Sequence, residues 1–317
     1  MTIWPLKSSP AEATASNYRR ELAVTFDDVP LQPSPPDNDT LPDFETLCGI
    51  NGRLLDKLRQ HGIPAIGFVN EKRLHYYERV DTRVSLLRMW LDAGLELGNH
   101  TFSHATPETA SLTAYLEDIM RGEELTRPLL EERGRRLRYF RHPQLHTGTD
   151  PEYKRGLEQF LGGRGYTIAP VTIKHQGWVY AVIYADAANR KDVELMRRLA
   201  VAYLSYLEMC FEFFEQLSIT VLGYEIRQIL LLHVNELNTD HLNDMVEMIK
   251  GRGYAFVTLE YALEDKAYLL SDEYAGAKGP SWLHRWGYTM GLELPAEPRE
   301  PEFIKELYRA VTEGSHG

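Results

Sequence analysis

The sequence has little cysteine, no long apolar run and no excess of positive charge. Its two cysteines, Cys48 and Cys210, cannot build a disulfide framework, which leaves either one bridge or two unpaired thiols. No apolar run reaches the length of a membrane-spanning helix, and residues 226–233 are too few, so we expect no integral membrane segment. A formal net charge of -11 argues against a nucleic-acid partner and against binding to anionic lipid.

A targeting signal is also missing from the start of the chain as given. Residues 1–21 contain several charges, Pro5 and Pro10, but no apolar run of signal-peptide length. We therefore expect a chain without an export segment, cytoplasmic as written. Whether a longer precursor carries a leader, and with it an extracytoplasmic location, stays open, as does the oligomeric state.

What the chain does contain is an alternation of strand-like and helix-like stretches. Its 317 residues, 43% of them hydrophobic, are ample for a large core, and barrels of this size routinely form one domain. Short apolar runs alternate with amphipathic stretches, most of which end at glycine, and this pattern is typical of parallel βαβ units in an α/β fold. The predicted strands cover residues 22–26, 65–69, 95–97, 137–140, 167–168, 228–233 and 255–258. The predicted helices cover residues 51–61, 80–93, 150–161, 192–216 and 240–250.

We expect three parts of the chain. Residues 1–21 form an N-terminal arm, residues 22–270 the domain of βαβ units, for which the resemblance given below implies a (β/α) barrel, and residues 271–317 a C-terminal extension packed on that domain. The aromatic stretch 282–286 is expected to pack on the barrel, with stacking against a sugar as the alternative.

Two short motifs supply the residue types of a metal site. Asp27 and Asp28 are adjacent at the end of the first predicted strand, and His100 and His104 follow another strand, four residues apart. One carboxylate and two imidazoles form a three-ligand set for a catalytic divalent ion that keeps a coordination position for water. The second carboxylate is then a candidate base. In isolation, such an Asp pair is more often a turn or helix cap, and such a His pair is more often unrelated to metal.

Further polar residues follow other predicted strands. Arg141 and His233 each end a strand, as the Asp and His pairs do. In a parallel barrel the carboxyl ends of the strands meet on one face, where active sites are built. Arg141 alone would be read as a structural ion pair, and His233, at the end of a very apolar strand, as a buried core histidine. Their common position favours a shared site.

These residues carry a family resemblance. The chain resembles the polysaccharide deacetylases (NodB-homology domains, carbohydrate esterase family 4) over roughly residues 22–263. Thr25-Phe26-Asp27-Asp28 looks like the first family motif, and His100-Thr101-Phe102-Ser103-His104 matches the second. Phe140-Arg141-His142-Pro143 and Leu230-Leu231-Leu232-His233 resemble two later motifs. The resemblance implies an irregular (β/α) barrel and hydrolysis of acetyl groups on an acetylated carbohydrate.

The same resemblance implies a role for each matching residue. Asp28, His100 and His104 would bind the metal, most simply Zn²⁺, with Co²⁺ as an alternative. Asp27 would be the general base, His233 the general acid, and Arg141 the residue that orients the base. Pro143 and Trp178 would contact the substrate, although core packing is an equal explanation for Trp178.

One segment departs from the family pattern. The fourth family motif carries aspartates before a tryptophan, whereas residues 171–178 here contain no carboxylate. Either His175 or Asp186 compensates, or catalysis is weakened because a buried cation lacks its partner. Two functions from different classes follow: an active deacetylase, or a metal-containing glycan-binding protein with impaired catalysis, in which Gly177→Asp is expected to raise activity. A third interpretation is a barrel hydrolase acting on a non-carbohydrate amide or imide. The sequence does not distinguish amide from ester substrates, nor does it identify the glycan.

Overall fold

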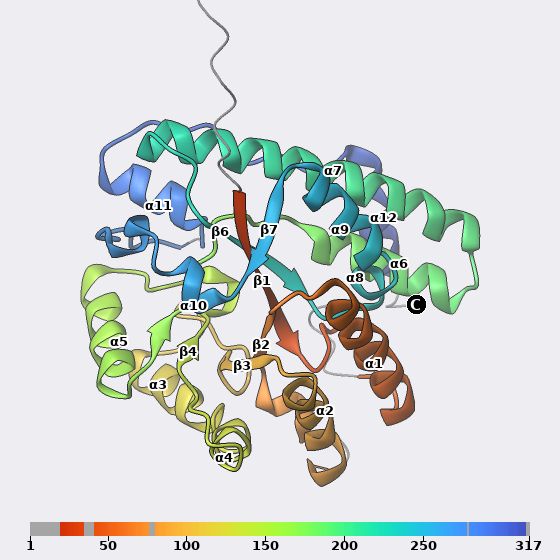
Figure 1. Ribbon diagram of the computed structural model, residues 1–317, viewed down its shortest axis with the longest axis horizontal. Helices are drawn as coiled ribbons and strands as arrows, with labels where there is room; N and C mark the ends of the chain where they lie inside the picture. Colours follow the sequence, from red (N-terminus) through yellow and green to blue (C-terminus); the bar gives the residue numbers. More distant parts are fainter. Residues whose placement is uncertain (1–19, 35–40, 76–79, 278, 315–317) are drawn as a thin grey trace, which may run out of the picture.

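The centre of the molecule is a sheet of seven parallel strands (Figure 1). The computed structural model describes residues 20–34, 41–75, 80–277 and 279–314. Neighbouring strands follow the order β5-β4-β3-β2-β1-β6, and β7 pairs with the first half of β1. The strands are β1 (Arg20–Val29), β2 (Ile66–Val69), β3 (Glu96–Asn99), β4 (Tyr139–Phe140), β5 (Thr167–Ile168), β6 (Gln228–His233) and β7 (Tyr254–Val257).

The two ends of this strand order meet. Ile173, shortly after β5, forms a parallel bridge with Leu230 of β6. The backbone N–H of Ile173 donates to the carbonyl of Ile229, and the N–H of Leu231 donates to the carbonyl of Ile173. The segment that follows β5, at one edge of the sheet, therefore pairs with β6 at the other edge. The irregular (β/α) barrel predicted from the resemblance is confirmed.

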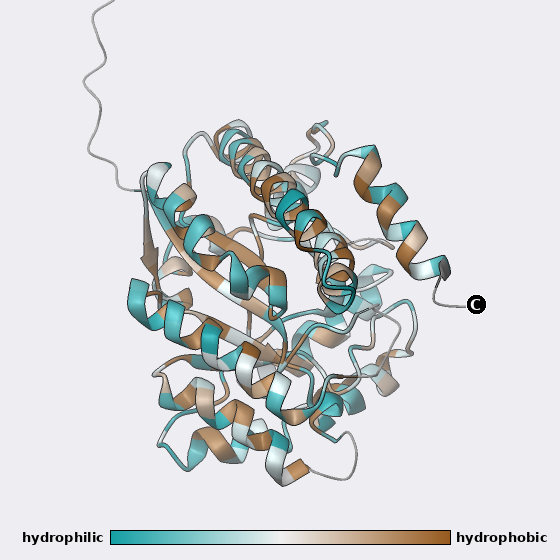
Figure 2. Cartoon of the chain, turned by 90° about the vertical axis from the view of Figure 1, so that its right-hand side faces the viewer, coloured by the Kyte–Doolittle hydropathy of each residue, from teal (hydrophilic) through white to brown (hydrophobic). Residues whose placement is uncertain are grey.

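Helices surround the sheet, with their apolar faces toward it (Figure 2). β1 is buried without interruption from Leu22 to Val29, as expected for a parallel strand covered on both faces. The helices are α1 (Phe44–His61), α2 (Val80–Asp92), α3 (Leu112–Arg121), α4 (Thr126–Glu131), α5 (Pro151–Gly163), α6 (Gly177–Asn189), α7 (Val193–Leu222), α8 (Glu236–Asp240), α9 (Leu242–Gly251), α10 (Leu259–Ala262), α11 (Trp282–Thr289) and α12 (Glu302–Gly314). Short 3₁₀ turns are η1 (Glu71–Leu74), η3 (Pro143–Leu145) and η4 (Lys266–Leu269).

The five predicted helices are present as α1, α2, α5, α7 and α9, but the prediction missed α3, α4, α6, α8, α10, α11 and α12, and two helices show why it fell short. α1 begins well before residue 51, because the Asp43 side chain caps its first turn and Leu47 and Ile50 are buried. α6 was not predicted at all. It is apolar on nearly every side and therefore has no helical periodicity, and it is buried against α7, α8 and α12.

The C-terminal residues lie on the barrel helices. α11 packs against α7 and α12 packs against α6. Trp282 and Trp286 are 7% and 1% exposed, which agrees with packing rather than with stacking on a sugar. The boundary at residues 270 and 271 stays a prediction, and residues 1–19 of the predicted arm lie outside the described residues.

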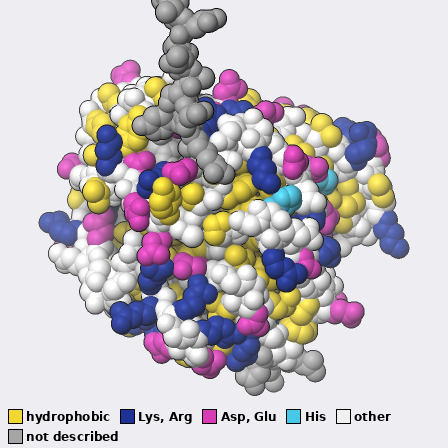
Figure 3. Space-filling model, in the orientation of Figure 1, with side chains coloured by type: hydrophobic (Ala, Val, Ile, Leu, Met, Phe, Trp, Pro, Cys, Tyr) yellow, Lys and Arg dark blue, Asp and Glu magenta, His cyan; other side chains and the backbone are white. Residues whose placement is uncertain are grey.

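The described residues also bear on two simpler expectations. None of their helices combines the length and the apolar character that a bilayer crossing requires. Cys48 and Cys210 are free thiols, so no bridge joins them. Figure 3 shows acidic and basic side chains interspersed over one face of the molecule, where neither sign forms a continuous field.

Candidate active site

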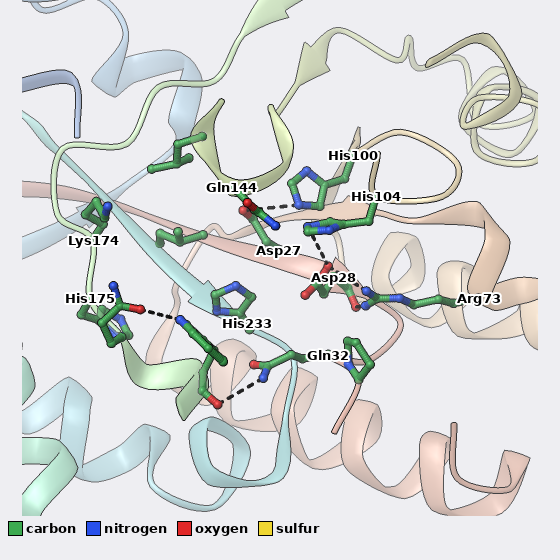
Figure 4. Close-up of a pocket in the computed structure, with 15 residues that line it drawn as sticks. Asp27, Asp28, Gln32, Arg73, His100, His104, Gln144, Lys174, His175 and His233 are labelled. Carbon is green, nitrogen blue, oxygen red and sulfur yellow. Dashed lines mark hydrogen bonds and ion pairs between the residues drawn. The ribbon is translucent and has the colours of Figure 1, made fainter. Parts of the chain in front are cut away.

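The carboxyl ends of β1, β2, β3 and β6 meet around one cavity of about 460 Å³. The register sets Asp27 of β1 opposite His233 of β6, and Val69 of β2 opposite Asn99 of β3. We call one side of the cavity the carboxylate side, formed by Asp27, Asp28, Arg73, His100 and His104. The α6 side, which leads into helix α6, is formed by Lys174, His175, Gln176 and Trp178 (Figure 4). His233 lies between the two sides.

The carboxylate side contains a set of three candidate metal ligands. One ligand atom from each of Asp28, His100 and His104 lies within 4.8 Å of the other two. The Nε2 of His104 is 3.8 Å from Asp28 Oδ1, and the two imidazole ring centres are 5.1 Å apart. Described residues offer no other group of three or more His, Cys, Asp or Glu ligands at such spacing.

The hydrogen bonds of this set leave His100 Nε2 and Asp28 Oδ1 available to bind a metal ion. His100 Nδ1 lies 2.8 Å from the carbonyl oxygen of Arg141, which can only accept, so Nδ1 carries the proton and Nε2 presents a lone pair. Asp28 Oδ1 is buried and accepts no hydrogen bond. A carboxylate oxygen and imidazole nitrogens are the donors that Zn²⁺ takes in catalytic sites. The residues present therefore fit a divalent ion.

The backbone at this side is locally strained. Asp28, Thr101 and His104 have φ angles of 65°, 64° and 61°, in the left-handed region that non-glycine residues seldom adopt. Such conformations persist only where surrounding contacts hold them, and they cluster at functional sites. Each of the two metal motifs therefore contains a strained residue that is itself a candidate ligand.

The two adjacent carboxylates titrate in opposite directions. Burial raises the pKa of Asp27 to about 7, against the opposing effect of Arg141. Burial also acts to raise the pKa of Asp28, but Arg73, His104 and the other imidazoles outweigh it and hold that pKa below its usual range. Asp28 is thus the carboxylate suited to remain ionised as a ligand, and Asp27 the one suited to exchange a proton near neutrality.

Arg141 is fully buried behind Asp27. Its Nη1 lies 3.4 Å from Asp27 Oδ1, and its Nη2 donates to Thr25 Oγ1 at 3.0 Å. The guanidinium also lies over the ring of Phe68, at 4.6 Å from its centre. These contacts fix Arg141 against Asp27, the position that the resemblance implies for a residue that orients the base.

His233 has no comparable partner. Its Nδ1 is buried without a hydrogen bond, and in the described parts of the chain no carboxylate forms an ion pair with it. Burial lowers the pKa of His233 to about 4, only partly opposed by Asp28. The ring is therefore neutral near neutrality.

The α6 side explains why that partner is missing. Lys174 Nζ turns to Glu297 at 3.3 Å and to the carbonyl of Gly279, both in the C-terminal part of the chain. His175 Nδ1 accepts from the N–H of Gly177, and burial lowers the pKa of His175 to about 3. Asp186 pairs with Arg190 and does not line the cavity. The alternative that Asp186 replaces the missing carboxylate is therefore wrong.

The two predicted substrate contacts differ in position. Trp178 lines the cavity, where its Nε1 donates to Gln176 Oε1 at 2.5 Å. Pro143 is buried at the start of η3, and the residues after it, Gln144 and Leu145, line the cavity instead.

Two neighbours of the site were missed at the level of sequence. Arg73 Nη2 lies 3.2 Å from Asp28 Oδ1. Asn70 Nδ2 donates to the carbonyl of His100 at 2.5 Å. Asn70 follows β2 directly, and Arg73 lies in the next turn, η1. The rule of strand ends could have found Asn70, since β2 was predicted and no polar residue had been assigned to its end.

The family model for "Polysaccharide deacetylase" matches residues 15–154, which contain the two metal motifs and Arg141. This part of the chain is therefore similar to polysaccharide deacetylases. The match ends before His233 and the α6 side, and no curated protein matches the chain.

Solved structures of carbohydrate deacetylases and a related pseudoenzyme are only distantly similar to this chain. The polysaccharide deacetylase Bc1974 from Bacillus cereus is 16% identical, with a TM-score of 0.49, over 76% of this chain and 92% of that one. The chitin deacetylase from the fungal pathogen Colletotrichum lindemuthianum is 22% identical, with a TM-score of 0.48, over 78% and 89%. A mutant of BA3943, a protein of Bacillus anthracis described as a CE4 family pseudoenzyme with restored enzymatic activity, is 15% identical, with a TM-score of 0.46, over 78% and 68%. At this level none of them assigns a substrate or an activity to the chain.

Proposed function

We propose that this protein is a metal-dependent hydrolase that removes acetyl groups from an acetylated carbohydrate, with Zn²⁺ as its ion and Co²⁺ as a substitute. The observation that carries the proposal is the ligand set of Asp28, His100 and His104 within 4.8 Å, beside a buried second carboxylate. When bound, a divalent ion supplies a water of lowered pKa and polarises the acetyl carbonyl.

Asp27 is placed to accept the proton of the attacking water. Its Oδ2 lies 3.7 Å from His100 Nε2, on the face that the ligands share, and its pKa of about 7 suits a general base near neutrality. Arg141 holds Oδ1, the other oxygen, so that Oδ2 stays directed to the cavity. Thr25 in turn fixes Arg141.

His233 is placed to deliver a proton to the leaving nitrogen or oxygen. It stands opposite Asp27 in the β1–β6 register and lines the same cavity. An amide nitrogen leaves poorly unless it is protonated, so this step matters most for an N-acetyl substrate.

The test is acetate release from N-acetylglucosamine oligomers and from acetylated xylan, with Zn²⁺ or Co²⁺ added. Turnover that stops on chelation and returns on re-addition of metal supports the proposal. Turnover that survives complete chelation contradicts it.

A second candidate function is a metal-containing glycan-binding protein with impaired catalysis. The observation that favours it is the segment 171–178, which has no carboxylate and leaves the buried His233 Nδ1 without a hydrogen bond. The pKa values point the same way, because burial raises that of Asp27 to about 7 and lowers that of His233 to about 4. Because Asp27 works ionised and His233 works protonated, few molecules hold both working states at once.

A substitution that supplies an acid separates the two candidates. Gly177→Asp is unsuitable, because a Cβ at Gly177 would lie 2.5 Å from the ring of His175. His175→Asp instead puts a carboxylate into the place of a side chain that already interacts electrostatically with His233. Impaired catalysis predicts oligosaccharide binding without turnover in the unmodified protein, and turnover in His175→Asp.

A further inference from the structure

Arg73 forms an ion pair with the metal-ligand candidate Asp28. Its Nη2 lies 3.2 Å from Asp28 Oδ1, closer than His104 Nε2 at 3.8 Å. Both side chains are shielded, with exposed fractions of 12% and 7%. Figure 4 shows the guanidinium approaching Asp28 from the side opposite the imidazoles.

The guanidinium is held in place by more than this ion pair. Its Nη1 donates to the carbonyl of Leu31 at 2.8 Å and to the carbonyl of Asp28 at 3.4 Å. One side chain thus contacts both the backbone and the carboxylate of a residue in a strained conformation. Arg73 is anchored to the β1 loop and does not swing freely.

The oxygen that Arg73 approaches is the one that faces His104. Asp28 Oδ1 is buried and forms no hydrogen bond, so its lone pairs are divided between the guanidinium and the space among the ligands. A metal bound to that oxygen at the usual ligand distance of about 2 Å would lie a few ångströms from the positively charged guanidinium. In a shielded site like charges at that distance repel strongly.

We infer that Arg73 shares the Asp28 carboxylate with the bound metal ion and thereby weakens metal affinity, while it compensates and orients Asp28 whenever the ion leaves. The inference rests on the metal site of the proposed function. It assigns Arg73 a positioning role and makes the ion exchangeable rather than permanently held.

The experiment compares three proteins by calorimetric titration with Zn²⁺ and Co²⁺ after chelation and dialysis. Arg73→Gln removes the charge, Arg73→Lys retains it, and Arg133→Gln removes the charge of an arginine paired with Asp92 in another ion pair. We expect Arg73→Gln to bind both ions at least 10-fold more tightly than the unmodified chain. The metal affinities of Arg73→Lys and Arg133→Gln should stay within about threefold of that of the unmodified chain. Mutation of a group that contacts a metal ligand typically changes metal affinity by about 10- to 100-fold.

Thermal unfolding gives a second readout that needs no substrate. Without its counter-charge the buried Asp28 is destabilising, so Arg73→Gln should melt at a lower temperature in chelator and gain more from added metal than the unmodified chain. A variant that folds only with metal present supports the inference, and one that stays unfolded with metal contradicts it. Unchanged or weaker metal binding by Arg73→Gln also overturns the inference. If the unmodified protein takes up no divalent ion, the proposed function itself fails.

Discussion

The two sides of the cavity differ in how far their polar groups are compensated. On the carboxylate side, Asp28 faces Arg73, Asp27 faces Arg141, and His100 donates to a backbone carbonyl. Across the cavity, no described carboxylate forms an ion pair with His175 or His233, although buried atoms without a hydrogen bond occur on both sides. Lys174 directs its charge outward to Glu297.

Under the proposed function, this contrast separates two tasks of the site. Holding an ion and placing a base depend on the carboxylate side, where every charge has a counter-charge. Delivering a proton to the leaving group depends on His233, whose pKa of about 4 reflects burial without a carboxylate partner. If the proposed function holds, the site is better suited to metal binding and water activation than to proton donation, and the predictions below test that difference.

The largest effect is expected for Asp28→Asn, which removes the charge of one ligand and keeps the shape and the tolerance for a positive φ. Metal affinity should fall by about 100-fold or more, and acetate release should fall with it. Titration calorimetry and an acetate assay check both. Asp186→Asn, in a surface pair with Arg190, is the matched control and should change neither.

Asp27→Asn should separate metal binding from catalysis. We expect kcat to fall by about 100-fold or more, because the proton acceptor is lost, while metal affinity changes little. Stoichiometric metal uptake and kcat are measured on the same preparation. Full activity of this variant would remove Asp27 from the mechanism.

His175→Asp sharpens the comparison from the α6 side. A carboxylate near His233 favours the imidazolium, so the pKa of His233 should rise and kcat should increase about 10-fold near neutrality. The pH profile of kcat should extend to higher pH at the same time. His175→Asn, which adds no charge, serves as the control, and an equal gain in both variants would argue against an electrostatic cause.

The buried histidines predict a loss of stability in acid. The pKa values of His175 and His233 fall from 6.5 to about 3 and about 4, so below pH 6.5 the unfolded chain takes up protons that the folded chain does not. Asp27 acts in the opposite direction, because its pKa is raised from 3.8 to about 7 and its folded form keeps a proton that the unfolded chain loses.

The pKa values of His100, His104 and His142 are lowered as well, so the buried histidines together outweigh Asp27 between pH 7 and pH 5. We expect a net loss of stability over that interval, measured as denaturant unfolding in the presence of chelator. Asp27→Asn should steepen the loss and His175→Asn should reduce it. Stability that is flat from pH 7 to pH 5 would contradict the assigned directions.

The smallest effect concerns Trp178, whose ring lines the cavity and meets Tyr308 of α12 edge-on at 5.6 Å. Trp178→Ala should raise KM for an oligosaccharide by about 3- to 10-fold with little change in kcat, since stacking on a sugar acts on binding. Tyr308→Ala should produce a weaker change of the same kind. A fall in kcat without a change in KM would instead indicate that Trp178 only supports the fold.

Much of the site could be predicted because its residues lie in short local motifs. Asp27 and Asp28 are adjacent, and His100 and His104 are four residues apart. Each pair lies at the end of an apolar strand. Parallel strands bring their carboxyl ends to one face, so position along the chain was enough to gather these residues. The division into strands followed from the same pattern, and the barrel followed from the family resemblance.

What the sequence determined by itself was therefore the strands, their ends and the three candidate ligands, because local apolar patterns and parallel pairing imply them. Only the tertiary structure decided that Arg73 meets Asp28, that Asp186 lies away from the cavity, and that Gly177 has no room for a side chain. These depend on the exact path of loops between strands and on the placement of α6, which has no periodicity to reveal it. Side-chain charges far apart in sequence are paired by packing, and packing is a property of the whole fold.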